Sequence, residues 1–323
     1  MIKIAIYMQP YGSSSTVVGP YEVFNSAGRN FNFITGREVK RHFDIELVSS
    51  DGHPVTFQGG IQIAAQKRLE EVTNPDIIFI SSCGYDLDIS AQKLPVIEWI
   101  KETASQGGVI ASVCTGLGLF AETGLLDHKR ATTHWSAVEE FRKRYPKIEL
   151  VSDELFVEEG DLYTGGGSYA GNDLALHLVG RFCGETVKRE CAKALVLDTR
   201  RPSQGSYTGI LHHRIHSDAQ IHQVQDMLEK TYSNEINFDE IARTFNMSPR
   251  NFHRRFKQAC GETPLNYLQK QRVEAAKGLL EQTKKNIVAI AQDVGYEDAN
   301  YFREVFKRYA SCTPSAYREK FAD

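Results

Sequence analysis

The 323-residue sequence contains no run of 18 apolar residues, and this absence argues against a membrane-spanning helix. Its six cysteines, at positions 83, 114, 183, 191, 260 and 312, form no C-x-x-C pair and no regular spacing, which argues against a disulfide framework. The chain begins with a strand-like stretch over residues 2–8 and not with a charged and apolar leader. We therefore expect a soluble, cytoplasmic protein with reduced thiols and no membrane partner.

Charge is nearly balanced over the whole chain, with a net value of −3, but it is unevenly distributed. Residues 241–320 hold 15 Lys and Arg against 8 Asp and Glu, a net charge of +7. Residues 1–240 hold 23 against 32, a net charge of −9. The basic C-terminal end is where we expect a polyanion to bind. The alternative is that these cations only solvate the helices.

A sequence pattern near the C-terminus occurs twice, with a separation of 50 residues. Each copy has an Ile-Ala pair in a short apolar segment, then a break, and then a longer segment. The shared pattern is Phe252-x-x-x-Phe256-Lys257 with Thr263-Pro264-x-x-Tyr267, and Phe302-x-x-x-Phe306-Lys307 with Thr313-Pro314-x-x-Tyr317. Two helix-break-helix units of this kind are typical of proteins that read DNA.

In the first copy, Ser248-Pro249 supplies an N-cap and a proline suited to the first helical position, so we expect a helix to begin at Pro249. Phe252 and Phe256 lie four residues apart and should both face inward. The side chains expected on the outer face can donate to phosphates or base edges: Arg250, Asn251, His253, Arg254 and Lys257.

In the second copy, Gly295 should end the support helix in a left-handed conformation, and Asp298 should cap the next helix. The residues expected on its outer face are Asn300, Arg303, Glu304, Lys307 and Arg308. Apolar periodicity predicts a further helix over residues 264–282 between the copies. That helix would hold the two reading helices at a fixed separation.

Residues from about 218 to 323 resemble the AraC/XylS-type DNA-binding domain, on strings such as Met247-Ser248-Pro249-Arg250 and Thr313-Pro314-x-x-Tyr317-Arg318. The resemblance implies an all-α domain with two helix-turn-helix motifs that binds double-stranded operator DNA. Two positions depart from the family pattern. Ser311 stands where such domains usually carry glycine, as Gly261 does after the first reading helix, and serine tolerates a left-handed turn less well. Glu304 stands where arginine is common, and a carboxylate can accept from cytosine but repels phosphate.

The first 198 residues alternate strand and helix patterns. Strands are predicted over residues 2–8, 45–49, 76–81 and 109–113, and helices over 94–105, 117–123, 172–182 and 187–197. This alternation predicts an α/β fold with a mostly parallel sheet covered by helices. A polar stretch rich in Gly, Pro and Ser over residues 198–206 is typical of a linker.

Within this α/β region, Val109 to Val113 should form a buried strand that ends on Cys114 and turns through Gly116 into a helix. Such an elbow lifts a nucleophile above the sheet and places its sulfur near a helix N-terminus, where the dipole favours a thiolate. His134 is a candidate base or ligand contact. The alternative is a small buried thiol with a hydrogen-bonded histidine.

The strings Gly19-Pro20-x-Glu22-Val23-Phe24, Val113-Cys114-Thr115-Gly116 and Ala131-Thr132-Thr133-His134-Trp135 resemble the ThiJ/PfpI-like, glutamine-amidotransferase-like domain, in the branch fused to AraC-type domains known as GlxA-family regulators. The resemblance implies a flavodoxin-like sandwich whose cysteine pocket binds a small, nitrogen-containing metabolite. The expected ligand-binding residues are Thr16, Cys83, Gly84, Cys114, Thr115, His134 and Trp135.

Two departures favour binding over catalysis. Catalytic relatives carry an acid where this chain has Thr16, and those with protease-like activity carry histidine where it has Thr115. Without such a partner, acid–base chemistry at Cys114 lacks an obvious proton shuttle. Cys114 and His134 thus remain candidates only, and a cysteine-dependent hydrolase, hydratase or amidase with an attached DNA-binding module is the alternative function. Cys83 would place a second thiol near Cys114, which permits oxidant sensing or is a neutral substitution.

Other ligand-like patterns are weaker. His212-His213-x-x-His216 and His222 lack acidic or thiol companions, so we expect no metal and place them in a solvated linker. Gly165-Gly166-Gly167-Ser168 precedes a helix without a following Lys-Ser/Thr pair, so we expect a tight turn and no nucleotide cofactor. We therefore expect residues 1–198 to sense an effector and form a homodimer, 199–217 to link, and 218–323 to bind DNA.

Overall fold

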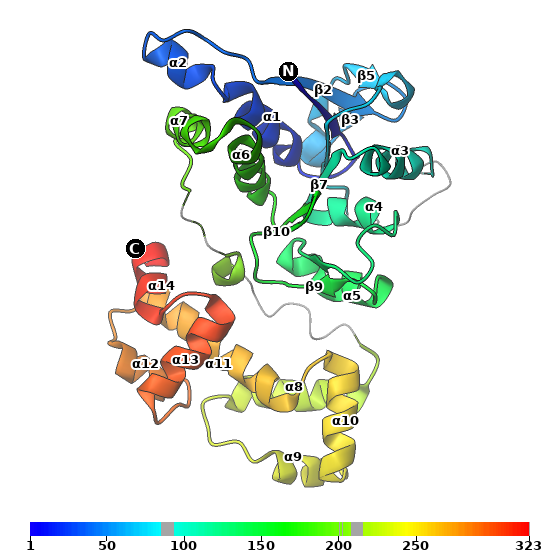
Figure 1. The fold of residues 1–323 in the computed structure, drawn as a ribbon. Coiled ribbons are helices and arrows are strands. Elements are labelled where there is room, and N and C mark those ends of the chain that lie inside the picture. The colour runs from blue at the N-terminus through cyan, green and yellow to red at the C-terminus, as the bar shows by residue number, and fades with distance from the viewer. Residues whose placement is uncertain (85–93, 200, 202, 208–215, 323) are drawn as a thin grey trace. The chain divides into compact units, whose positions relative to one another are not determined.

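The computed structural model describes residues 1–84, 94–199, 201, 203–207 and 216–322. The chain divides into two compact units, Met1–Gln204 and Gly205–Asp323 (Figure 1). The boundary lies inside the stretch that the composition predicts as a linker. Among the described residues, no helix is both long and apolar enough to cross a membrane.

The first unit is built on a seven-stranded sheet with the order β10-β11-β7-β6-β1-β2-β5. All neighbouring strands are parallel except the β10–β11 hairpin at one edge. The sheet strands are β1 (Ile2–Tyr7), β2 (Phe43–Ser49), β5 (Lys67–Arg68), β6 (Ile77–Ile80), β7 (Val109–Val113), β10 (Phe156–Glu159) and β11 (Leu162–Gly165). The parallel order β2-β1-β6-β7-β11 is the flavodoxin-like order that the resemblance implies, so the predicted fold class is confirmed.

Helices cover both faces of this sheet (Figure 1). One apolar cluster joins alternate strand residues such as Ile4, Ile6 and Phe79 to α1 (Ser15–Ser26), α6 (Ala170–Cys183) and α7 (Glu185–Leu195). The opposite cluster joins Ala5 and Ile78 to α3 (Leu94–Ser105), α4 (Leu117–Ala121) and α5 (Val138–Arg144). Successive side chains of a strand point to opposite sides of the sheet, so each face contributes to its own cluster. Because helices cover both sides, both faces of the sheet are buried.

Shorter elements complete the unit: α2 (Asn30–Ile34), the β3–β4 hairpin (Val55–Thr56 and Gln62–Ile63) and the β8–β9 pair (Arg130–Ala131 and Glu149–Leu150).

The second unit is helical and contains two apolar clusters. The helices are α8 (Ala219–Thr231), α9 (Phe238–Thr244), α10 (Pro249–Cys260), α11 (Pro264–Gln282), α12 (Ile287–Asp293), α13 (Ala299–Ala310) and α14 (Pro314–Phe321). The first cluster joins α8, α9 and α10 to the start of α11, and the second joins the rest of α11 to α12, α13 and α14. The predicted double helix-turn-helix is thus confirmed, and α11 belongs to both copies.

The helix starts follow the capping chemistry read from the sequence. The side chains of Ser248, Thr263, Asp298 and Thr313 each accept a backbone N–H at the start of their helix, and prolines follow Ser248, Thr263 and Thr313. These caps explain why α10, α11, α13 and α14 begin where they do.

The stretch predicted as a linker packs on both units. In the first unit, Arg201 forms an ion pair with Asp173, and the Ser203 hydroxyl donates to the carbonyl of Asp153 at 2.7 Å. In the second unit, Ser206 donates to the carbonyl of Ala310 at 2.9 Å, and Tyr207 packs edge-on against Phe321. Polar composition predicted solvent exposure here, but the polar groups are used in hydrogen bonds.

Candidate functional site

Cys114 lies on a strained elbow between β7 and α4. Its φ of 57° is in the left-handed region, which a residue with a side chain rarely adopts. Two residues later, a Cβ at Gly116 would lie 2.5 Å from the carbonyl oxygen of Ser81, so only glycine fits there. This packing against the end of β6 turns the chain sharply and fixes the cysteine above the sheet.

The thiol of Cys114 is buried, with 9% of the residue exposed. Burial raises the pKa of the Cys114 thiol above its ordinary value, although hydrogen bonds from Thr115 and Ser168 act in the opposite direction. Desolvation of the charged form thus acts against the thiolate that the helix dipole favours, and it outweighs the local donors.

Cys83 lies beside the elbow, at the end of β6. The Thr115 hydroxyl donates to the carbonyl of Cys83 at 2.7 Å, and the Cys83 thiol donates to the carbonyl of Thr115 at 3.6 Å. Gly84 follows, and a Cβ there would lie 2.9 Å from the Cβ of Tyr11. The structure therefore brings Cys83, Gly84, Cys114 and Thr115 together at the carboxyl ends of β6 and β7.

Thr16 lies behind this group and is fully buried. Its hydroxyl donates to the carbonyl of Ser13 at 2.6 Å and accepts the backbone N–H of Ser82 at 3.1 Å. These bonds tie the start of α1 to the end of β6. The position that carries an acid in catalytic relatives here holds a structural hydroxyl.

His134 lies after β8, where Thr133 donates its hydroxyl to the carbonyl of Cys114 at 2.8 Å. The Nδ1 of His134 accepts the backbone N–H of Ser136 at 3.2 Å and lies 2.7 Å from the Ser136 hydroxyl oxygen. In a neutral imidazole the accepting nitrogen carries no proton, so the ring presents an N–H at Nε2. The Trp135 ring lies against that of His134, with centroids 5.2 Å apart.

The turn between β11 and α6 completes this group, and the sequence reasoning had not assigned it to the site. The Ser168 hydroxyl hydrogen-bonds the Cys114 thiol, and a Cβ at Gly167 would lie 3.2 Å from the His134 ring. The Gly-Gly-Gly-Ser string was visible as a strand-to-helix turn, but only the sheet order β6-β7-β11 places it beside the elbow. We name the elbow site as Cys83, Gly84, Cys114, Thr115, His134, Trp135 and residues 165–168.

Within the described residues, no group of three or more His, Cys, Asp or Glu side chains could hold a metal ion. His222 belongs to α8, and its ring stacks on His216 with centroids 4.0 Å apart. The two histidines also share a hydrogen bond of 2.8 Å from the His222 ring to the carbonyl of His216. The solvated-linker interpretation is therefore wrong for this pair, while His212 and His213 lie outside the described residues.

The two reading helices present the predicted polar faces. On α10 and α13 the paired phenylalanines are fully buried. The predicted contact residues are exposed, except Asn251, which is half-buried. These residues are Arg250, Asn251, His253, Arg254 and Lys257 on α10, and Asn300, Arg303, Glu304, Lys307 and Arg308 on α13. Asparagines orient one arginine on each helix, since Asn251 accepts from Arg254 and Asn300 from Arg303, both at 2.8 Å.

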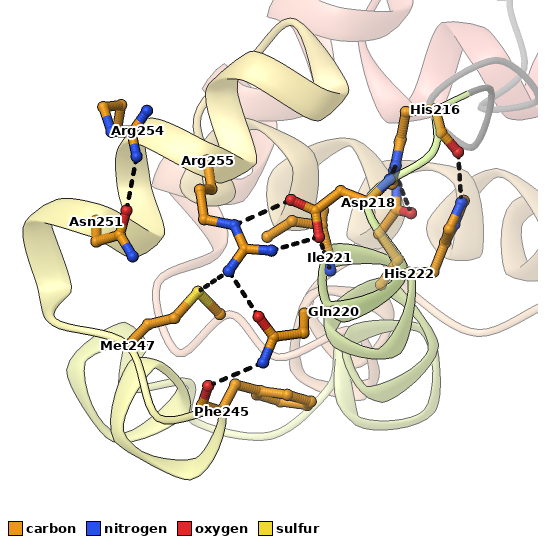
Figure 2. Close-up of polar contacts among 11 residues, drawn as sticks. His216, Asp218, Gln220, Ile221, His222, Phe245, Met247, Asn251, Arg254 and Arg255 are labelled. Atoms are coloured by element: carbon orange, nitrogen blue, oxygen red, sulfur yellow. Dashed lines mark hydrogen bonds and ion pairs between the residues drawn. The ribbon is translucent and has the colours of Figure 1, made fainter.

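A residue that the sequence reasoning missed fixes α10 to α8. Arg255 donates to both carboxylate oxygens of Asp218, at 3.0 and 2.7 Å, and to Gln220 at 2.6 Å (Figure 2). Asp218 is also the N-cap of α8, because its carboxylate accepts the backbone N–H of Ile221. Arg255 faces away from the reading side and therefore acts as a brace between α8 and α10.

Comparison with known proteins agrees with both halves of this architecture. Residues 2–181 match the DJ-1/PfpI family, and residues 241–320 match a helix-turn-helix domain. The chain belongs to the DJ-1/PfpI family. Behind the family domain it carries an AraC-type helix-turn-helix domain, the arrangement found in GlxA-like transcriptional regulators.

Three relatives illustrate the similarity. The HTH-type transcriptional regulator CdhR of Pseudomonas aeruginosa is 27% identical over 279 residues, which cover 84% of this chain and 80% of that protein. The HTH-type transcriptional regulator GlxA of Rhizobium meliloti is 23% identical over 299 residues, covering 90% and 89%. The isonitrile hydratase of Pseudomonas putida is 29% identical over 184 residues, covering 57% and 73%.

Proposed function

We propose that this AraC-family transcriptional regulator binds operator DNA through α10 and α13, under the control of a small molecule bound at the elbow site. The observation that carries the proposal is the pair of reading helices, in which an almost identical buried face supports a different exposed polar face. A helix that buries its phenylalanines and exposes arginine, asparagine and lysine has the chemistry required to contact phosphates and base edges. The DNA-contacting residues we assign are the ten predicted contact residues on α10 and α13 named above.

The two reading helices should enter successive major grooves on one face of the duplex. Because both pack on α11, their separation is fixed by the protein, and their contacts should lie about one helical turn, or roughly 10 base pairs, apart. Selection of bound sequences from random DNA, followed by footprinting of the full chain, tests this arrangement. A single protected groove, or the absence of any preferred sequence, would contradict it.

A small, nitrogen-containing molecule is the class of effector we propose for the elbow site. The elbow site combines the imidazole of His134, the thiol of Cys114 and the hydroxyls of Thr115 and Ser168, which are side chains that can donate and accept hydrogen bonds. A thermal-shift screen of such compounds on the full chain tests this, because a ligand that binds only the folded state raises its apparent stability. Cys114→Ala should weaken the shift, and an equal shift in that variant would place the ligand elsewhere.

Catalysis by Cys114 is less well supported. Burial raises the pKa of the Cys114 thiol, and position 16 carries a threonine hydroxyl bonded to the carbonyl of Ser13 in place of an acid, so both observations disfavour acid–base chemistry at this thiol. The similarity to an isonitrile hydratase makes amides and isonitriles the substrates to test. We expect no turnover of either class, and steady turnover that Cys114→Ala abolishes would establish the enzymatic alternative.

We also propose that the chain forms a homodimer through residues 1–198. A dimer raises the effective concentration of the second reader at a paired site, so it should bind two half-sites more tightly than one. If an effector changes operator affinity, operator DNA must change effector affinity by the same factor. Sedimentation of the full chain, and titration calorimetry in both orders, test these two statements.

A further inference from the structure

Gln204 is the last residue of the α/β unit, and only 3% of it is exposed although it lies in a stretch of linker composition. Its backbone N–H donates to the carbonyl of Asp153 at 2.9 Å. Its side chain points into the unit, where the carboxamide nitrogen donates to the carbonyls of Thr133 at 2.8 Å and Glu154 at 3.2 Å, and to the Thr132 hydroxyl at 3.2 Å. The chain therefore leaves this unit from an anchored residue.

The carboxamide oxygen of Gln204 is buried and has no hydrogen-bond partner among the described residues. An unpaired buried acceptor loses its bonds to water without replacement, so the buried position carries a cost that the three donated bonds must offset. The free-energy difference between the buried and the solvated side chain is therefore smaller than the three hydrogen bonds alone would give. A small displacement of the neighbouring residues could therefore release the side chain of Gln204 from its buried position.

The residues around Gln204 adjoin the elbow site, and Gly166 belongs to both. Thr133 accepts from Gln204 through its carbonyl and donates to the carbonyl of Cys114 through its hydroxyl, at 2.8 Å for both bonds. In the opposite wall, a Cβ at Gly166 would lie 2.7 Å from three atoms of the Gln204 carboxamide. The next two residues face the site, Gly167 towards the His134 ring and Ser168 towards the Cys114 thiol.

We propose that Gln204 couples the elbow site to the segment that leads into the helical unit. A molecule bound against Cys114 and His134 displaces the Thr132–His134 segment or the turn at residues 165–168, and either displacement moves the carboxamide of Gln204. Release of Gln204 removes the last anchor of the chain in the α/β unit and changes where the chain leaves that unit. This inference rests on the proposed function, because it names the residue through which occupancy of that site would reach the DNA-binding helices.

Two substitutions in the full chain should release Gln204 by independent routes. Gln204→Glu places a carboxylate opposite three acceptor oxygens, which repel it. Gly166→Ala introduces a methyl group where the carboxamide now lies, and the flexible end of Gln204 can yield to it at little cost to the backbone. Gln62→Glu, at an exposed position of β4, is the matched control, since it makes the same chemical change where the side chain is open to solvent.

Hydrogen exchange followed by mass spectrometry measures the release directly. Each of the two variants should speed exchange of the Gln204 amide, which donates to the carbonyl of Asp153, by about tenfold, because exchange of a protected amide follows the population of the open form. The same variants should speed iodoacetamide alkylation of Cys114 by about threefold or more, since loss of the Gln204 contacts loosens the walls around a buried thiol. Slow exchange of β7 in the same samples shows that the unit is still folded.

The two routes should also converge. In a Gln204→Ala background the space opposite Gly166 is empty, so adding Gly166→Ala should produce no further increase in either rate. Unchanged exchange in Gln204→Glu and Gly166→Ala would overturn the proposal, and so would faster exchange without faster alkylation of Cys114. The measurement uses neither DNA nor effector, so its failure would leave the proposed regulator standing. A failure of operator binding would equally leave the Gln204 result intact.

Discussion

The two helix-turn-helix copies are alike inside and different outside. In the first copy, the rings of Phe256 and Tyr267 pack edge-to-face with centroids 5.4 Å apart and an angle of 76°. In the second copy, Phe306 and Tyr317 pack with centroids 5.6 Å apart and an angle of 81°. The apolar pattern therefore fixes one geometry twice, which leaves the outer face of each reading helix free to diverge.

The outer faces have diverged in charge. The position held by Arg254 in α10 is held by Glu304 in α13, and Arg250 corresponds to Asn300. Arginine pairs best with guanine, asparagine with adenine, and glutamate with cytosine. The two copies are thus expected to prefer different bases, so the DNA site should not be a simple direct repeat.

The two copies also differ in which of their two left-handed turns contains glycine. The turn before the reading helix uses Asn246 at φ 53° in the first copy and Gly295 at φ 88° in the second. After the reading helix the order reverses, with Gly261 at φ 76° and Ser311 at φ 56°. Each copy therefore contains one glycine and one residue held in a conformation that costs energy.

The largest effect should come from closing the space at Gly295. A Cβ there would lie 2.7 Å from the backbone carbonyl oxygen of Ser233, and the positive φ adds strain, so Gly295→Ala should destabilise the second copy by about 3 kcal/mol. Asn246→Ala keeps a side chain that the turn already accommodates and should cost about 1 kcal/mol. Hydrogen exchange of α13 and α10 in the full chain measures both, and equal losses would refute the comparison.

The next effect concerns base preference. Arg254→Ala should weaken operator binding by about 1–3 kcal/mol and relax the preference at one base pair, if Arg254 contacts a base edge. Glu304→Ala should relax a preference at a different pair, with tighter binding to non-operator DNA because a charge that repels phosphate is lost. Binding to a panel of single-base operator variants measures both. Uniform weakening across that panel by Arg254→Ala would identify a phosphate contact instead.

The element boundaries were predictable wherever the chain marks them chemically. Residues 94–105, 109–113 and 264–282 were predicted with the observed bounds, and in the last of them the structure shows that a Thr-Pro pair starts the helix. The β10–β11 hairpin and α8 were not predicted, although α8 carries Ile221, Val224 and Leu228 at helical spacing behind the Asp218 cap. Where the local sequence pattern is weak, tertiary packing decides which secondary structure the segment forms.

The site was less predictable because its properties depend on contacts between distant segments. The elbow at Cys114 was read from one local string, but the direction of its pKa shift depends on how deeply the fold buries the sulfur. Gln204 and Arg255 were missed for the same reason, since their partners lie 71 and 37 residues away along the chain. For Gln204, the composition of residues 198–206 predicted a linker, whereas the structure shows a buried side chain.

A smaller effect separates the two copies by their dependence on pH. Partial burial opposes ionisation of Asp218, but hydrogen bonds from Ile221 and Arg255 outweigh it and hold the pKa of Asp218 below its usual value. A lowered pKa stabilises the fold above the unfolded value of about 4, and that contribution disappears as the pH falls through the folded pKa. The second copy has the buried Val305 at the position of Arg255.

Arg255→Met should therefore destabilise α8–α10 by about 1–2 kcal/mol at pH 7, with little change in α12–α13. The difference from the wild-type chain should begin to shrink as the pH falls below about 4, the unfolded value, and should disappear only below the lowered folded pKa of Asp218, where the carboxyl group is protonated in both proteins. Hydrogen exchange of α10 at several pH values, corrected for intrinsic exchange rates, follows this loss. A difference that stays constant down to pH 3 would exclude the ion pair as its cause.

The smallest effect, and the most direct test of the exchanged glycines, is at the end of each reading helix. Ser311 adopts the left-handed conformation as the C-cap of α13, and its N–H still donates to the carbonyl of Lys307 at 2.9 Å. Relief of the left-handed strain favours Ser311→Gly by about 1–2 kcal/mol, while the greater freedom of glycine in the unfolded chain offsets about 0.5–1 kcal/mol of this. A net stabilisation of about 0.5–1 kcal/mol should remain, visible as slower exchange in α13.

The converse change, Gly261→Ser, should destabilise α10 by a similar amount, because the N–H of residue 261 makes the same bond to the carbonyl of Lys257 at 2.9 Å. If Ser311→Gly instead destabilises α13, the serine must contribute a contact that outweighs its strain, and the two C-caps would not be equivalent.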